Sequence, residues 1–146
     1  MPGSRCSVAP SRSAFSYAVM RIVPDIEREE FINAGVVMFD RERRYLVARM
    51  SLDAPALEAM RDGCDVEAIR AQLRNIEDIA AGTLLVAPFS TMSQSERFGW
   101  LTTARSTIVQ PGPLHAGTTE DPDATFEHLY RLLVARREAG AGEREG

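Results

Sequence analysis

The stretch FSYAVMRIVPDIEREEFINAGVVMFDRERRYLVARM, residues 15–50, contains three apolar runs separated by charged connections. The first run, Phe15–Val23, is apolar on both alternating faces except at Ser16 and Arg21, a pattern typical of a central strand. Pro24 ends this run, because proline cannot continue the hydrogen-bond ladder of a central strand. The stretch therefore predicts a β-sheet with the first run in its interior.

The second and third runs, Ile32–Phe39 and Tyr45–Met50, are joined by the short charged link Asp40–Arg44. A link of this length between strand-forming runs predicts a β-hairpin. Gly35 inside the second run indicates a bulge or a close approach by another group. The charged segment 25–30 is a connector that can hold a single helical turn.

Helical periodicity begins after these strands. Asp53 can cap a short helix through Met60, and Asp65 can cap a longer helix that Gly82 ends. The longer helix carries apolar residues at three- and four-residue spacing; these are Val66, Ile69, Leu73, Ile76 and Ala80. Residues 83–89 fit either a short edge strand or an extended connection.

A further helix and a strand follow. Ser93 and Glu96 can form a capping box at the start of a helix that runs through Ala104. Ser106–Gln110 then reads as a strand that Pro111 cuts off.

The closing helix begins at Asp121, with Pro122 at its first helical position. Its apolar residues form one stripe, which predicts that the helix packs on the sheet. The members of the stripe are Phe126, Leu129, Tyr130, Leu133 and Val134.

These elements predict an α+β fold, with an antiparallel sheet of about four strands and helices packed mainly on one face. We expect a single domain over 14–137, because a chain of 146 residues is long enough to bury one core. Residues 1–13 and 138–146 are expected to be disordered tails, since nothing in them is patterned to pack.

The composition excludes several classes of protein. A net charge of −4 and a pI near 5.2 argue against a general nucleic-acid binder. All 17 basic residues are arginine, so a Schiff-base lysine and a phosphate-loop lysine are excluded. No apolar run approaches the roughly 20 residues of a membrane span, and we expect a cytoplasmic protein without membrane contact. Cys6 and Cys64 lie too far apart to suggest a disulfide framework or a zinc site.

Polar side chains gather in the segment ERFGWLTTARSTIVQPGPLHAGTTEDP, residues 96–122. Loops of this kind often carry binding residues, and arginine forks beside hydroxyls suit a phosphate or a carboxylate. The candidate anion-binding residues are Arg97, Arg105, Ser106, Thr107, Gln110 and His115. In the alternative, Arg97 pairs with Glu96 or Glu120 and the threonines cap turns; both interpretations stay open.

Four further residues are secondary candidates. If their strands are adjacent, Arg21 and Arg49 would form a cationic floor beneath the late segment; alternatively, they lie at a sheet edge with their stems over apolar surface. Glu30 and Asn33 could take part in acid–base or metal chemistry, but a solvated, charge-mixed connector is the favoured reading.

These residues do not match the sequence motif of any known type of catalytic site. His115 is expected on a loop and His128 inside the last helix, and their spacing predicts no metal site. Phosphate loops and dinucleotide fingerprints are missing. We therefore expect no metal and no cofactor and assign no catalytic residue, which favours a protein that is not an enzyme.

Three blocks, SYAVMRIVPDIEREEFINAGVVMFD, ERFGWLTTARSTIVQ and PLHAGTTEDP, resemble the bacterial family catalogued as domain of unknown function 3037. The resemblance covers Ser16 to Val134. Members of this family are small standalone proteins, often encoded beside a HipA-like serine/threonine kinase of the toxin–antitoxin and persistence systems. The resemblance implies such a kinase as a partner.

Two hypotheses about function follow. The leading one is a non-catalytic accessory or interaction protein that acts with a HipA-like kinase. The alternative is a small-molecule binder or enzyme that acts on a phosphate- or carboxylate-bearing ligand at residues 97–121. Nucleic-acid binding is disfavoured by the acidic charge balance.

Overall fold

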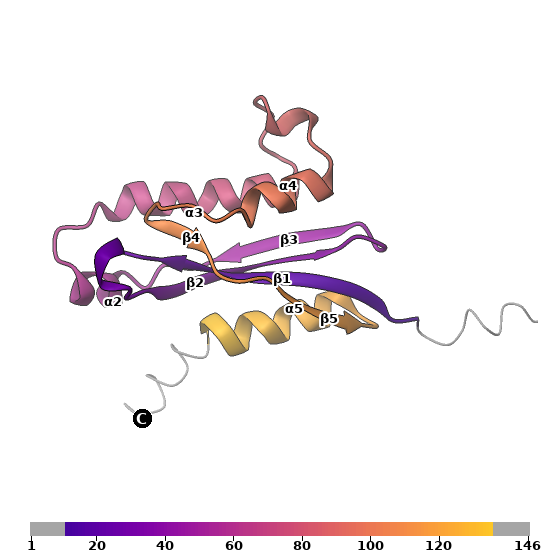
Figure 1. Cartoon of the computed structure of the whole chain (residues 1–146), viewed down its shortest axis with the longest axis horizontal. Coiled ribbons are helices and arrows are strands. Elements are labelled where there is room, and N and C mark those ends of the chain that lie inside the picture. Colours follow the sequence, from indigo (N-terminus) through magenta and orange to yellow (C-terminus); the bar gives the residue numbers. More distant parts are fainter. Residues whose placement is uncertain (1–10, 136–146) are drawn as a thin grey trace, which may run out of the picture.

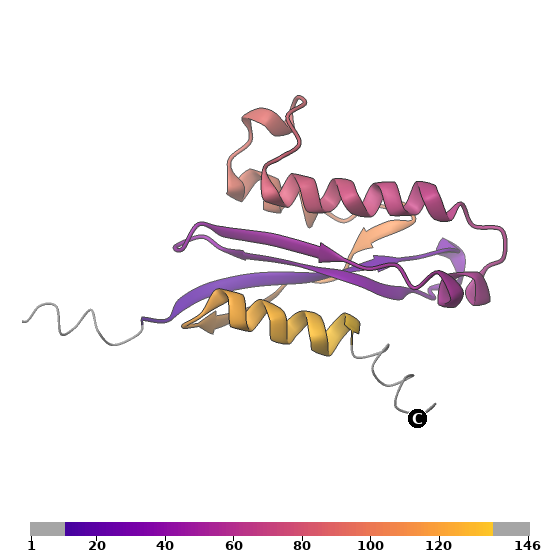
Figure 2. The same ribbon diagram turned by 180° about the vertical axis from the view of Figure 1, so that it is seen from behind.

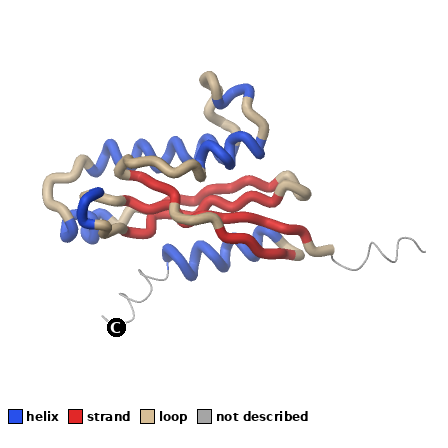
Figure 3. The backbone as a smooth tube through the Cα atoms, in the orientation of Figure 1, coloured by secondary structure: helices blue, strands red, loops and turns tan. Residues whose placement is uncertain are grey.

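The computed structural model describes residues 11–135, which form a five-stranded antiparallel sheet with helices on both faces (Figures 1 and 3). The strands are β1 (Ser13–Ile22), β2 (Ile32–Asp40), β3 (Tyr45–Met50), β4 (Val109–Pro111) and β5 (His115–Thr119). The helices are α2 (Ala54–Met60), α3 (Val66–Ala81), α4 (Gln94–Leu101) and α5 (Pro122–Tyr130). Short 3-10 turns occupy Ile26–Arg28 and Phe89–Thr91, and a π-helical turn, Arg131–Ala135, continues α5. The predicted α+β class is confirmed; the expected tail at 138–146 lies outside the described residues.

Strand β1 is the central strand, as its sequence predicts. The strand order is β3-β2-β1-β4, and β5 pairs with β1 as well. Along one edge β1 pairs with β2, and along its other edge it pairs with β4 through Met20–Ile22 and with β5 through Ser13–Tyr17. The ten residues of β1 are therefore long enough to pair with two strands in succession.

The predicted hairpin of β2 and β3 is present, with Asp40 opposite Tyr45. Gly35 lies opposite Met20, beside a register shift in the pairing of β1 with β2. A Cβ atom on Gly35 would lie 2.5 Å from the carbonyl oxygen of Arg49, a separation that no side chain tolerates. Both a bulge and a close backbone approach thus account for this glycine.

The caps predicted from the sequence are also present. Asp53, Asp65 and Asp121 each accept a hydrogen bond from a main-chain NH in the first turn of α2, α3 and α5, at 3.1 to 3.2 Å. Ser93 and Glu96 close a capping box at the start of α4. Gly82 ends α3 with φ of 80°, a left-handed conformation that glycine adopts without strain.

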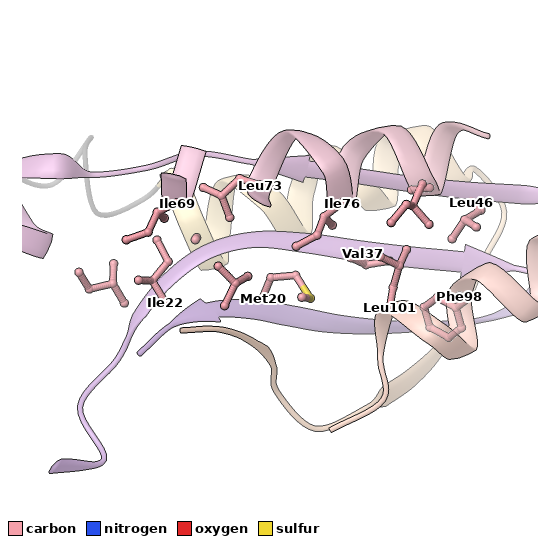
Figure 4. Close-up of a cluster of buried hydrophobic side chains, with 14 of the residues drawn as sticks. Met20, Ile22, Val37, Leu46, Ile69, Leu73, Ile76, Phe98 and Leu101 are labelled. Carbon is pink, nitrogen blue, oxygen red and sulfur yellow. The ribbon is translucent and has the colours of Figure 1, made fainter. Parts of the chain in front are cut away.

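Successive residues of β2 are buried, so both faces of the sheet are covered. Val36, Val37 and Met38 are each 0% exposed, although neighbouring side chains point to opposite faces. On one face, α3 and α4 cover the larger core, to which α2 adds Leu57 from the end of the sheet (Figures 1 and 4). It includes Met20, Ile22, Val37, Leu46, Ile69, Leu73, Ile76, Phe98 and Leu101.

The closing helix α5 lies against the face of the sheet opposite α3 and α4 (Figure 2). Its stripe packs as predicted, with Phe126 and Val134 buried and Leu129, Tyr130 and Leu133 half-buried. They meet Phe15, Val36 and Met38 of the sheet in a second, smaller core. Helices α3 and α4 share one face (Figure 1), but α5 has to cover the other, because the alternating side chains of β1 and β2 are apolar on both sides.

Strand β1 begins at Ser13, inside the segment 1–13 that was expected to be a tail. The Ser13 hydroxyl donates a hydrogen bond to Asp40, and both side chains are buried. Arg43 donates its main-chain NH to Asp40 at 3.1 Å and its Nε to the Ser13 oxygen at 2.7 Å. Arg12 pairs with Glu120 at 2.6 Å. The domain thus starts slightly earlier than predicted, because polar contacts, which no apolar pattern reveals, fix this end; residues 1–10 lie outside the described part.

Polar contacts hold α5 and the following π-helical turn on the sheet. Arg49 of β3 binds Glu127 through both terminal nitrogens and lies over the ring of Tyr130, 4.9 Å from its centroid. Tyr45 donates its hydroxyl to Asp123 at 2.9 Å, and both its burial and this carboxylate raise its pKa. Together these contacts fix the orientation of α5 along β3.

The buried ring of Phe126 makes α5 essential for stability. We expect Phe126→Ala to destabilise the protein by about 3–5 kcal/mol, because it deletes an aromatic side chain that is 2% exposed. Leu129→Ala should cost less, since Leu129 is only half-buried. Denaturant unfolding measures both, with the exposed His128→Ala as the control on the same helix. A Phe126→Ala midpoint equal to that of His128→Ala would contradict the docking of this face.

The ion pair between Arg49 and Glu127 predicts a pH dependence. The Arg49 guanidinium lowers the pKa of Glu127 in the folded protein, so this pair stabilises the fold above the unfolded pKa of glutamate. That stabilisation is lost as the pH falls through the folded pKa of Glu127. Thermal unfolding across acidic pH should show a smaller pH dependence for Glu127→Gln than for the wild type. The control, Glu58→Gln, replaces an exposed glutamate of α2; equal profiles for all three proteins would refute the ion pair.

Candidate functional site

The connection between α3 and α4, residues 82–93, projects beyond the helical layer (Figure 1). It contains Leu85 and Val86, which are 77% and 57% exposed. We call these two side chains the apolar tip. The segment is an irregular loop that ends in the 3-10 turn, so of the two expected conformations the extended connection is the one present. Scattered exposed apolar residues are common, but this pair directly follows Leu84, which lines a cavity.

Beneath the projecting loop, a cavity of about 260 Å³ opens between α3, α4 and β4. We call it the Trp100 cavity. It is lined by Gln72, Asn75, Ile76, Ile79, Leu84, Phe89, Trp100, Arg105, Thr107 and Val109. Its walls are mainly apolar, and among the residues that the structure describes, Arg105 is the only charged one in the lining.

Two aromatic rings form one wall of the Trp100 cavity. Phe89 meets Trp100 edge to face, with 4.9 Å between the ring centroids. Trp100, the only tryptophan of the chain, remains 38% exposed. Large, rigid aromatic side chains that are still open to solvent are typical of binding surfaces.

Arg105 lies against this wall. Its Cζ is 4.5 Å from the centroid of a Trp100 ring, within the range of a cation–π contact. Its Nη2 donates to the Trp100 carbonyl, and its Nε donates to the Thr103 carbonyl at 3.2 Å. Partial burial lowers the pKa of its guanidinium. Arg105 is thus partly removed from water and forms no ion pair with an acidic residue in the described range 11–135.

Arg97 holds the base of the projecting loop. Its Nε donates to the Ile79 carbonyl and its Nη1 to the Met92 carbonyl, both at 2.9 Å. The guanidinium also lies against Gly82, where an added Cβ would meet Arg97 Nη2 at 3.4 Å. Arg97 therefore ties the end of α3 to the residues before α4, and neither predicted pairing, with Glu96 or with Glu120, is present.

The remaining candidates lie along the chain after α4. Ser106 is exposed, while Thr107 lines the Trp100 cavity and donates its hydroxyl to the Val109 carbonyl at 2.8 Å. Gln110 donates to the Thr107 carbonyl at 2.7 Å, which shapes this turn. The predicted strand here is shorter than expected and begins at Val109.

His115 does not join the arginines. It begins strand β5 instead of lying on a loop, and its ring stacks on Tyr17 with 5.1 Å between centroids. Tyr17 packs with the core beneath α5, so His115 lies on the face of the sheet opposite α4. His115 therefore does not share a site with the other anion-binding candidates, Arg97 and Arg105, because β1 offers a second pairing edge that draws the segment after Pro113 into the sheet.

The two mid-strand arginines do not form a shared floor. Arg21 lies on β1 and Arg49 on β3, and β2 separates these strands. Arg21 lies over Phe31, 4.1 Å from the ring centroid, and its buried Nε has no hydrogen-bond partner among the described residues. Arg49 is engaged with Glu127 of α5.

Glu30 and Asn33 do not form a common site either, because each is engaged in a different contact. Glu30 pairs with Arg28 at 2.9 Å in the exposed connector, as the solvated alternative predicts. Asn33 donates to the Leu133 carbonyl at 3.2 Å and helps to hold the π-helical turn. These residues have structural roles and share no site.

Sequence reasoning missed the Trp100 cavity as a whole. Its walls come from α3, the projecting loop, α4 and β4, which follow one another along the chain but enclose a cavity only through their tertiary packing. The exposure of Trp100 could not be read from the apolar pattern of its helix. Only Arg105 and Thr107 were singled out. The buried Asp40 was also missed, because it looked like part of a charged link.

The structure supplies two further observations on sites. No cluster of three or more histidine, cysteine, aspartate or glutamate side chains suited to a metal ion occurs within residues 11–135. Over the same residues, no helix has the length and apolarity that crossing a membrane requires.

Comparison with known proteins identifies a family. The family model described as protein of unknown function (DUF3037) matches residues 17–134, close to the span of the resemblance noted in the sequence. No curated protein and no solved structure matches the chain. Because the match covers most of the chain, the protein belongs to the DUF3037 family.

Proposed function

We propose that this chain is a cytoplasmic, non-catalytic interaction protein that docks a partner protein on the apolar tip and the Trp100 cavity. The partner we propose is a HipA-like serine/threonine kinase, which the family resemblance implies. The observation that carries the proposal is that two widely exposed aliphatic residues directly follow Leu84, which lines an aromatic-walled cavity. Aromatic residues and arginine are the side chains that most often anchor protein interfaces.

The rigidity of the surrounding structure supports the proposal. Arg97 and the capping box fix the N-terminal end of α4, the helix that bears Trp100, against the end of α3. The loop is anchored further by Phe89, which packs against the main core. A surface whose supports are already ordered loses little conformational entropy on binding, which favours affinity.

A site for a free phosphate or carboxylate ligand across residues 97–121 has weaker support. Two nitrogens of Arg97 already bind main-chain carbonyls, and His115 lies on the other face of the sheet. Arg105 and Thr107 remain available to a ligand in the Trp100 cavity. This part of the alternative is compatible with protein docking.

Co-expression with a HipA-like kinase from the same organism tests the proposal. We expect the wild-type chain to co-purify with the kinase in a stoichiometric complex. Leu85→Asp should weaken the complex about 30-fold or more, because it buries an unpaired charge in the interface. Its fold should be unaffected, since Leu85 is 77% exposed.

Leu132→Asp is the matched control, because Leu132 is an exposed leucine beyond α5, 43% exposed. It should co-purify with the kinase like the wild type. Failure of the wild-type chain to bind the kinase would refute the partner. Equal binding by the wild type and Leu85→Asp would refute the docking surface.

A further inference from the structure

The Trp100 cavity has the size of a pocket for one large side chain. Its volume of about 260 Å³ lies below the roughly 300–1,000 Å³ of typical ligand and cofactor sites. A pocket of this size at a protein interface is filled by a single anchoring residue of the partner. The walls formed by Leu84, Phe89 and Trp100 favour an apolar anchor.

The charge inside the cavity sets a second requirement for the group that binds there. Arg105 is its only charged lining residue and is half-buried without an acidic partner in the described part of the chain. Its Nε and Nη2 donate to carbonyls, whereas its Nη1 makes no hydrogen bond with any described residue. A partly desolvated guanidinium is stabilised by a carboxylate, so the cavity is electrostatically complementary to an acidic group.

We infer that the Trp100 cavity recognises a partner segment in which an apolar side chain is followed by an acidic residue. The apolar side chain fills the space between Phe89, Trp100 and Leu84, and the carboxylate accepts a hydrogen bond from Nη1 of Arg105. This inference rests on the proposed function and names the chemistry that the docking surface selects.

The sole tryptophan makes the inference directly measurable. In ¹⁵N-labelled full-length protein, Trp100 gives a single indole NH resonance, and every change of that resonance reports on the cavity. The probes are the capped dipeptides acetyl-Leu-Glu-amide, acetyl-Leu-Gln-amide and acetyl-Ala-Glu-amide, titrated to millimolar concentrations. We expect a saturable shift with the Leu-Glu peptide, at about fivefold or more higher affinity than with the Leu-Gln peptide, because a charge-assisted hydrogen bond is lost. The Ala-Glu peptide should bind more weakly as well, because its methyl group leaves the apolar space unfilled.

Two variants assign the preference to one guanidinium. Arg105→Gln should bind the Leu-Glu and Leu-Gln peptides equally. Arg74→Gln removes the same charge from the exposed face of α3, outside the cavity lining, and should keep the wild-type preference. Unfolding curves of the two variants check that each remains folded.

The outcomes separate this inference from the proposed function. If the wild type binds the kinase but no dipeptide shifts the Trp100 resonance, the docking surface stands and the recognition chemistry is wrong. Equal binding of the Leu-Glu and Leu-Gln peptides by the wild type would refute the role of Arg105. Tighter binding of octanoate than of any dipeptide would overturn the peptide occupant and make the cavity a small-molecule site.

Discussion

The fold depends on one constraint, the burial of the central strands on both faces. Val36, Val37 and Met38 follow one another in β2, and each is fully buried. Because neighbouring side chains of a strand point in opposite directions, a single helical layer cannot cover them. In this fold, α3 and α4 cover one face and α5 covers the other. Each buried apolar side chain contributes about 1.5–3 kcal/mol, so removal of either layer would expose more apolar surface than a domain of this size tolerates.

The covering of the two faces by different helices explains where the candidate site lies. The buried faces of α3 and α4 are used by the core, and their supports, Arg97 and the capping box, hold the loop between them away from the sheet. Leu85, Val86 and Trp100 are left open to solvent at this edge. The opposite face has fewer side chains free for binding. Its polar side chains, including Arg49, Asn33 and Tyr45, fix α5 and the turn that follows it. The surface side chains of the α3–α4 edge, where we propose docking, can therefore change without disturbing either core.

Much of this fold follows from local signals in the sequence. The central strand, the hairpin, the helix caps and the role of Gly35 depend on residues that are close in sequence, and all were predicted. The strand at His115 was not, because it forms only when the long β1 presents an unpaired edge far away in the chain. The start of the domain at Ser13 depends on a polar contact with the buried Asp40, and apolar periodicity carries no information on such contacts. The candidate site was predicted only in Arg105 and Thr107, since the Trp100 cavity exists through the tertiary packing of four separate elements.

We propose the α3–α4 edge as the surface on which this protein meets its partner. Hydrogen–deuterium exchange of the full chain, alone and in the presence of a HipA-like kinase, tests it most directly. The account predicts slower exchange of main-chain amides in residues 83–92 and in α4 on addition of the kinase, with α5 unchanged. Protection confined to α5 and β5, or exchange that is identical in both samples, would contradict it.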